Sequence, residues 1–180
     1  MKVICMKKFF IVVCFLFVSV VSVAEILPDT FFGYKIGDVT SLESIDSTLR
    51  ANGILPDKIE KDELHGTITI RDYEYLGYSW NLVLFELSDI DNKLEHVDFI
   101  LTTTKRSESR KRFYSLQTKF KKEIKGLPNV IGKQSLRYIG ENGIEMGIVF
   151  PQFFSISSWP EYQVFLYYKK SKPRDSRLEE

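Results

Sequence analysis

The sequence contains few side chains that could carry out covalent or metal chemistry. Its two cysteines, Cys5 and Cys14, lie in an apolar leader, and its only histidines are His65 and His96. Without a cysteine beyond the leader, the chain has no thiol nucleophile and no thiolate metal ligand. His96 and Asp98 share one face of an expected strand, but a metal site would need further ligands, and a solvated strand face explains the pair more simply.

Other candidate motifs are incomplete. Asp89, Asp91 and Glu95 have a spacing similar to that of a calcium loop, but the central glycine and the distal glutamate are missing, and Lys93 stands at a ligand position. An ordinary hairpin turn is the better interpretation. No phosphate loop and no nucleophile elbow is present. We therefore expect no catalytic residue, metal or cofactor, although a hydrolase with carboxylates far apart in the sequence remains an alternative.

A basic segment is the first candidate binding surface. Residues 105–125 contain nine basic and two acidic residues. A solvated helix face would account for them, and so would contact with an anionic polymer, lipid headgroups or an acidic protein. The candidate binding residues in this segment are Arg110, Lys111, Lys119 and Lys122.

Aromatic residues form the second candidate surface. Phe153, Phe154 and Trp159 lie in an expected loop over residues 151–160. Exposed aromatic side chains there would provide a hot spot for a protein partner or a stacking platform for sugar rings. A second group, within residues 73–80, is expected to form cross-strand pairs and core instead.

The first 24 residues have the pattern of a signal peptide. Basic residues precede an uncharged run over residues 9–23, and small residues precede Glu25. We expect cleavage after Ala24 and export to the periplasm or beyond, with translation starting at Met1 or Met6. The mature chain should have no transmembrane segment, and export makes nucleic acid an unsuitable partner.

Residues 25–170 are long enough for a single domain with its own core, and the charged tail over residues 171–180 should be disordered. Charge is divided unevenly along the chain. Residues 25–104 hold six basic and sixteen acidic residues, whereas residues 105–180 hold sixteen basic and eight acidic residues. Either the two halves neutralise each other within one domain, or the basic half faces an anionic partner.

Hydrophobic alternation predicts an antiparallel sheet. Strands are expected at residues 67–71, 80–87 and 94–101, with Val97, Phe99 and Leu101 facing the core and His96 and Asp98 facing water. Residues 72–77 should form a loose loop or bulge, and residues 56–64 a charged loop. Three further strands are expected at residues 135–139, 144–150 and 162–169, the first two joined by a hairpin at Asn142-Gly143.

Two helices are expected. Thr40 and Glu43 fit a capping box, and Leu42, Ile45 and Leu49 form an apolar stripe after it. Ser107 should cap a second helix, which runs to about residue 125. Its apolar stripe consists of Phe113, Leu116, Phe120 and Ile124.

In order, these elements read as a helix and three strands, repeated once. That order resembles the tandem layout of small secreted α+β modules of the β-lactamase-inhibitor-like and PepSY-like type, and no diagnostic motif accompanies it. The resemblance implies a binding or inhibitory role without a catalytic centre. The sequence thus predicts an α+β fold, with an antiparallel sheet of about six strands and two helices packed on one face. It would be an exported, non-enzymatic binding module for an unknown protein, or alternatively for a carbohydrate or anionic cell-surface polymer.

Overall fold

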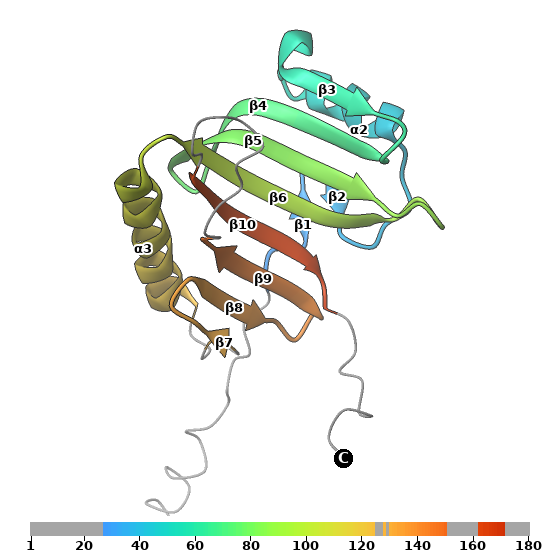
Figure 1. Ribbon diagram of the computed structural model, residues 1–180. Coiled ribbons are helices and arrows are strands. Elements are labelled where there is room, and N and C mark those ends of the chain that lie inside the picture. The colour runs from blue at the N-terminus through green and yellow to red at the C-terminus, as the bar shows by residue number, and fades with distance from the viewer. Residues whose placement is uncertain (1–26, 125–127, 129, 151–161, 172–180) are drawn as a thin grey trace, which may run out of the picture.

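The computed structural model describes residues 27–124, 128, 130–150 and 162–171. An eight-stranded antiparallel sheet with the strand order β3-β4-β5-β6-β10-β9-β8-β7 forms its centre (Figure 1). The expected α+β class with an antiparallel sheet is therefore confirmed. In chain order the elements are β1 (Thr30–Phe31), β2 (Tyr34–Lys35), α2 (Leu42–Ala51), the 3-10 turn η1 (Pro56–Lys58), β3 (Ile59–Asp62), β4 (Thr67–Tyr75), β5 (Tyr78–Leu87), β6 (Leu94–Thr103), α3 (Arg106–Glu123), β7 (Val130–Ile131), β8 (Ser135–Ile139), β9 (Ile144–Val149) and β10 (Tyr162–Lys170).

The element order repeats once, with four strands after each helix instead of the expected three. Strands β3 to β6 follow α2, and strands β7 to β10 follow α3. The two sets have mirrored order in the sheet, and they meet where β6 pairs with β10. The expectation of six strands was wrong because β3 and β7 are short edge strands. β3 lies in the segment expected to be a charged loop, and charged side chains are common on edge strands, where they oppose aggregation.

Alternating side chains give the sheet one strongly apolar face. Val83 on β5 lies opposite Phe99 on β6, and Phe99 lies opposite Leu166 on β10. All three side chains have no or almost no solvent exposure. Ile148 on β9 continues the row. Because successive residues of a strand point to opposite faces, the residues between these positions lie on the other face of the sheet.

The β4–β5 connection is tighter than expected. β4 ends at Tyr75 and β5 begins at Tyr78, so only Leu76 and Gly77 lie between them. Both have positive φ values, 57° and 76°, as a two-residue turn with the hand of a twisted hairpin requires. The expectation of a loose loop here was therefore wrong.

Helix α2 begins one residue later than the capping box predicts. Ser41, not Thr40, is the N-cap, and its Oγ accepts a hydrogen bond from the Ser44 amide at 3.2 Å. The expected stripe of Leu42, Ile45 and Leu49 is buried, and the helix lies against β4.

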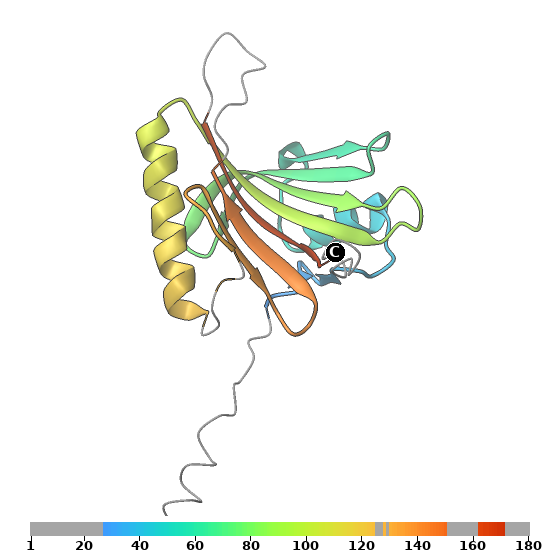
Figure 2. The same ribbon diagram turned by 60° about the horizontal axis from the view of Figure 1, so that its bottom comes forward.

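Helix α3 begins at Arg106, with Lys105 as an N-cap that makes no side-chain capping bond, so the expected cap at Ser107 was wrong. Its predicted stripe is confirmed, because Phe113, Leu116 and Phe120 are buried, as is Ile124 just beyond the helix. The helix lies against β6, β9 and β10. In both views α3 and α2 lie at opposite ends of the twisted sheet (Figures 1 and 2).

The N-terminal β1–β2 hairpin contributes to the core. The Phe31 ring lies 6.1 Å from the Phe99 ring and 4.8 Å from the Tyr168 ring, measured between centroids. It thereby contacts both strands of the central β6–β10 pair. Tyr34 on β2 donates a hydrogen bond to the Ser44 carbonyl of α2 at 2.6 Å, which ties the hairpin to that helix.

Candidate functional site

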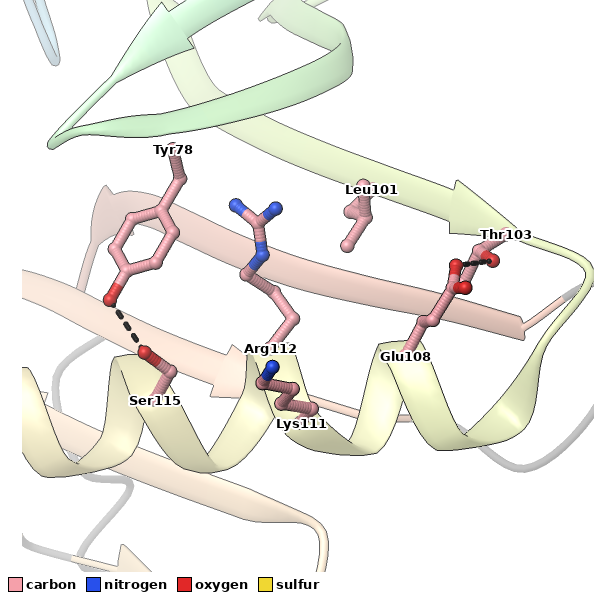
Figure 3. A pocket seen from close by; sticks show the side chains of 7 residues that line it. All are labelled: Tyr78, Leu101, Thr103, Glu108, Lys111, Arg112 and Ser115. Atoms are coloured by element: carbon pink, nitrogen blue, oxygen red, sulfur yellow. Dashed lines mark hydrogen bonds between the residues drawn. The ribbon is translucent and has the colours of Figure 1, made fainter.

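A groove lies between α3 and the adjacent ends of β5 and β6. It has a volume of about 400 Å³. Figure 3 shows the seven side chains that line it: Tyr78, Leu101, Thr103, Glu108, Lys111, Arg112 and Ser115. Tyr78 comes from the start of β5, Leu101 and Thr103 come from the end of β6, and the other four come from the first ten residues of α3. The groove therefore exists because β6 leads directly into α3.

Arg112 is the central side chain of the groove. Its guanidinium carbon lies 4.7 Å from the centre of the Tyr78 ring, a distance suited to a cation–π contact. The Tyr78 hydroxyl in turn makes a 2.9 Å hydrogen bond with the Ser115 hydroxyl one turn along α3. Arg112 is half-buried, and its Nη1 atom is cut off from solvent with no hydrogen-bond partner among the described residues. The tyrosine thus holds in place a guanidinium with an unused donor.

The groove ends at an acidic side chain that is already engaged. Glu108 accepts a hydrogen bond from the Thr103 hydroxyl at 3.0 Å and forms an ion pair with Lys105 at 3.2 Å. These contacts, first that with Lys105, lower the pKa of Glu108. Glu108 is therefore a charged structural group at the end of the groove, and no carboxylate among the described residues pairs with Arg112.

Three of the four predicted basic residues belong to the groove side of α3. Positions 111, 115, 119 and 122 are spaced by three or four residues, so they lie along one edge of the helix. Lys111 lines the groove, Lys122 is exposed further along, and Lys119 forms an ion pair with Glu123 at 3.4 Å. Arg110 is exposed, but its position lies about 100° around the helix from Lys111, away from the groove.

A second, smaller hollow adjoins the groove. It has a volume of about 250 Å³ and shares Leu101 and Arg112 with the groove. Asp72 and Glu74 lie on its far side. The Asn81 side chain accepts a hydrogen bond from the Thr102 amide at 2.7 Å and so continues the β5–β6 pairing where the backbone register ends. The two hollows together place Arg112 between a basic helix edge and an acidic strand.

A polar row crosses the other face of the sheet. Direct cross-strand neighbours in this row are Leu84 on β5, Asp98 on β6, Tyr167 on β10, Gly147 on β9 and Arg137 on β8. Asp98 was expected to face water, and it does so only in part, because its side chain is half-buried. Its Oδ1 atom is buried without a hydrogen-bond partner among the described residues. Burial raises the pKa of Asp98 to about 6, Glu86 adds to the rise, and Lys169 opposes it.

The Tyr167 ring covers the neighbouring part of this face. It lies directly over Gly147, where a β-carbon would be only 2.3 Å from the ring. Its hydroxyl donates a 2.9 Å hydrogen bond to Glu145, whose charge is balanced by Lys169 at 3.6 Å and Arg137 at 3.8 Å. Burial and the Glu145 carboxylate raise the pKa of Tyr167. The Glu145 carboxylate in this group is therefore engaged on several sides, whereas the Oδ1 atom of Asp98 beside it and the Nε atom of Arg137 are buried without a hydrogen-bond partner among the described residues.

The remaining candidates from the sequence have different outcomes. Phe153, Phe154 and Trp159 lie outside the described residues. In the other aromatic group, Trp80 is buried and Tyr75 stacks on Phe99 with ring centroids 4.1 Å apart, as expected for core.

The segment similar to a calcium loop is a hairpin turn between β5 and β6, as predicted, and Asp91 in it is paired with Lys93. No cluster of three acidic, histidine or cysteine side chains within the described part of the chain could hold a metal ion. No helix in that part is long and apolar enough to span a membrane.

Sequence reasoning did not select Arg112 or Tyr78. Arg112 is one of nine basic residues in its segment, and its only distinguishing signal is its position immediately before Phe113, at the edge of the apolar stripe. A basic residue at such a boundary position is half-buried by its neighbours. Tyr78 belongs to an aromatic group that was expected to form core, and its place beside α3 depends on a contact between residues 37 positions apart.

The fold and the groove define the class of the molecule: an α+β protein with a twisted antiparallel sheet and a surface groove centred on a half-buried arginine. The chain matches no protein-family model, no curated protein and no solved structure with which it was compared.

Proposed function

We propose that this protein is an exported, non-catalytic binding module that holds an acidic segment of a partner protein in the groove beside α3. The observation that carries the proposal is the state of Arg112: a half-buried guanidinium, stacked on Tyr78, with a buried Nη1 donor that has no acceptor among the described residues. A buried donor without a partner costs roughly 1–3 kcal/mol. A carboxylate from a partner would remove that cost.

The chemistry of the groove favours a carboxylate over other acceptors. A guanidinium offers parallel N–H donors that match the two oxygens of a carboxylate, and such charge-assisted bonds are stronger than neutral ones. Stacking on Tyr78 restricts the guanidinium before binding, so less rotamer freedom is lost when the partner docks. Leu101 supplies an apolar wall for the aliphatic part of an acidic side chain.

The basic edge of α3 supports the same proposal at longer range. Lys111 and Lys122 are exposed on the groove side of the helix, and their charge would speed the approach of an acidic partner at low salt. Lys119 contributes less, because Glu123 already neutralises it.

The proposal also includes two features that the sequence predicts: a signal peptide over residues 1–24, and the packing of both helices on one face of the sheet. An exported module with both helices covering one sheet face is similar in plan to the inhibitor-like secreted modules. The shared core supports this plan, since Leu49 of α2 and Phe113 of α3 belong to the same buried cluster. In an inhibitor-like protein, the acidic segment in the groove would belong to the target enzyme.

The hydrolase alternative has less support. Glu108, Asp72 and Glu74 are the carboxylates that line the two hollows. A general acid needs a raised pKa, whereas the ion pair with Lys105 lowers that of Glu108. Asp98 does have a raised pKa, but it lies on the polar sheet face and lines neither hollow.

The test is a binding titration with the purified protein and a fluorescent hexaglutamate peptide, with hexaglutamine as the neutral probe. We expect hexaglutamate to bind and hexaglutamine not to bind. The Arg112→Met variant, which keeps the aliphatic stem, should weaken hexaglutamate binding about tenfold or more, because a charge-assisted pair contributes about 1.5–3 kcal/mol. The matched Arg110→Met variant should change the affinity by less than about twofold.

Two results would overturn the proposal: no preference for hexaglutamate, or equal losses in the two arginine variants. A sulfated polysaccharide serves as the probe for the alternative of an anionic cell-surface polymer. If it binds more tightly than hexaglutamate, and if Arg110→Met weakens it as much as Arg112→Met does, the alternative replaces the proposal.

A further inference from the structure

The end of the sheet opposite the groove presents exposed apolar side chains on its turns. Ile90, in the β5–β6 turn, is 96% exposed, and Leu64, in the β3–β4 turn, is 84% exposed. Apolar side chains at turn tips add nothing to the core, and burying them against another surface would remove apolar area from water. Acidic residues flank them in the chain: Asp62 and Glu63 precede Leu64, and Asp89 and Asp91 stand on either side of Ile90.

The β5–β6 turn is held in one conformation. The Ser88 amide donates to the Lys93 carbonyl at 2.8 Å, and the Asn92 amide donates to the Ser88 carbonyl at 3.0 Å. The Ser88 hydroxyl accepts from the Ile90 amide at 3.3 Å, and Lys93 pairs with Asp91. Ile90 is therefore presented on a fixed turn, so little conformational entropy would be lost when it docks.

Asp89 is the carboxylate of this turn that remains available. It makes no hydrogen bond within the described residues, although its charge helps to raise the pKa of His65, whereas Lys93 engages Asp91. The turn thus offers one exposed apolar side chain next to one carboxylate with free hydrogen-bond acceptors among the described residues. The groove beside α3 offers the complementary pair, an apolar wall at Leu101 and an unpaired donor on Arg112.

The turn and the groove of one molecule cannot meet. Tyr78 of the groove lies at the start of β5 and Leu87 at its end. A strand of ten residues spans about 33 Å. Figure 1 shows the β5–β6 turn and α3 at opposite ends of the sheet. A contact between them therefore requires two molecules.

We infer that the protein associates with itself head to tail, with the β5–β6 turn of one copy docked in the α3 groove of the next. Ile90 packs against Leu101 and Tyr78, and Asp89 pairs with Arg112. The inference rests on the proposed function, because it assigns a partner to the same groove. A contact between two different surfaces of identical chains leaves one of each free at the ends, so it extends to chains of molecules or closes into rings.

The test is sedimentation of the full protein over a range of concentrations at low and high salt. We expect concentration-dependent association that weakens as salt rises, because opposite charges meet in the contact. Ile90→Lys places a positive charge at the basic groove, and Arg112→Glu reverses the groove charge. Each variant alone should self-associate at least tenfold more weakly than the unmodified protein, and so should be monomeric at concentrations where that protein associates. Lys111→Glu, at an exposed groove position, should weaken association without touching the buried part of the groove.

Mixing the two variants makes the test specific. Ile90→Lys keeps an intact groove and Arg112→Glu keeps an intact turn, so an equal mixture should associate under conditions where neither variant associates alone. The control variants Leu55→Lys, another exposed apolar position, and Arg110→Glu should associate like the unmodified protein.

An unmodified protein that is monomeric at every concentration, or a mixture that stays monomeric, overturns the inference. A closed dimer that survives both substitutions also overturns it, because such a dimer uses another surface. Hexaglutamate binding separates this failure from failure of the proposed function: if the peptide still binds through Arg112, the groove is a site for an acidic partner other than a second copy.

Discussion

Position 147 has no room for a side chain, because the Tyr167 ring lies directly over it. A methyl group there would force the ring away from β9 and break its hydrogen bond to Glu145. We expect Gly147→Ala to lower the free energy of unfolding by about 1–3 kcal/mol, the usual cost of overpacking. Urea denaturation measures it. In a Tyr167→Ala background the same substitution should cost much less, and an equal cost in both backgrounds would show that the ring is not the cause.

Asp98 makes stability depend on pH in an unusual direction. Its folded-state pKa is about 6, so the folded protein keeps a proton that the unfolded chain loses near pH 4. The folded state therefore binds more protons over this range, and the contribution of Asp98 to stability falls as pH rises from about 4 to about 6. At about 1.4 kcal/mol per unit of pKa, the fall amounts to about 3 kcal/mol.

Asp98→Asn should remove this loss. We expect the variant to match the unmodified protein near pH 4 and to be more stable above pH 6, by up to about 3 kcal/mol in urea denaturation. Asp62→Asn is the control of opposite sign, because the hydrogen bond with His65 lowers the pKa of Asp62, whose charged form therefore favours folding. If Asp98→Asn is equally stable or less stable at pH 8, Asp98 is not an unsatisfied buried carboxylate.

At the scale of the element, the start of α2 shows that a sequence pattern can predict a different N-cap residue from the one that the structure has. Thr40 and Glu43 have the spacing of a capping box, yet Ser41 supplies the capping oxygen and the Thr40 Oγ1 atom is buried without a partner among the described residues. The Thr40 amide instead donates to the Asn92 carbonyl at 2.9 Å. This contact with the β5–β6 turn fixes residue 40 outside the helix and shifts the cap by one residue.

Two matched substitutions test this assignment. Ser41→Ala should destabilise the protein by about 1 kcal/mol, the usual cost of losing an N-cap. Thr40→Ala removes a hydroxyl that has no partner, so it should cost clearly less. Thermal denaturation followed by circular dichroism compares the two variants. A larger loss for Thr40→Ala would restore the capping box as the correct interpretation.

The elements that could be predicted from the sequence are those whose signal is local. The stripe of α3 with Phe113 and Phe120 and the alternation over Val97 and Phe99 gave the right helix and the right strand. The 3-10 turn and the edge strand β3 could not be predicted, because polar residues near Pro56 also fit a loop and only pairing with β4 makes β3 a strand. The groove was equally hidden, since Tyr78 and Arg112 meet only through tertiary packing.

At the scale of the whole molecule, the mirrored strand order raises the question of whether the two halves fold together. The halves join at the β6–β10 pair, which has eight residues of register. Phe99 lies at this junction: its ring stacks on Tyr75 at 4.1 Å and lies within 6.3 Å of the Trp80 and Tyr168 rings, between centroids. A side chain that contacts both halves couples their stability, because neither half retains its packing when the other unfolds.

We expect a single cooperative transition that Phe99→Ala shifts for both halves together, by about 3–5 kcal/mol. In a Trp159→Phe background, fluorescence reports Trp80 in the first half, and the methyl NMR signal of Met146 on β9 reports the second. The two urea midpoints should coincide before and after the substitution. Tyr114→Ala, at a position that is 51% exposed, is the control and should cost under about 1 kcal/mol. If Phe99→Ala moves only the Trp80 transition, the halves are separate folding units, and the single domain expected over residues 25–170 is wrong.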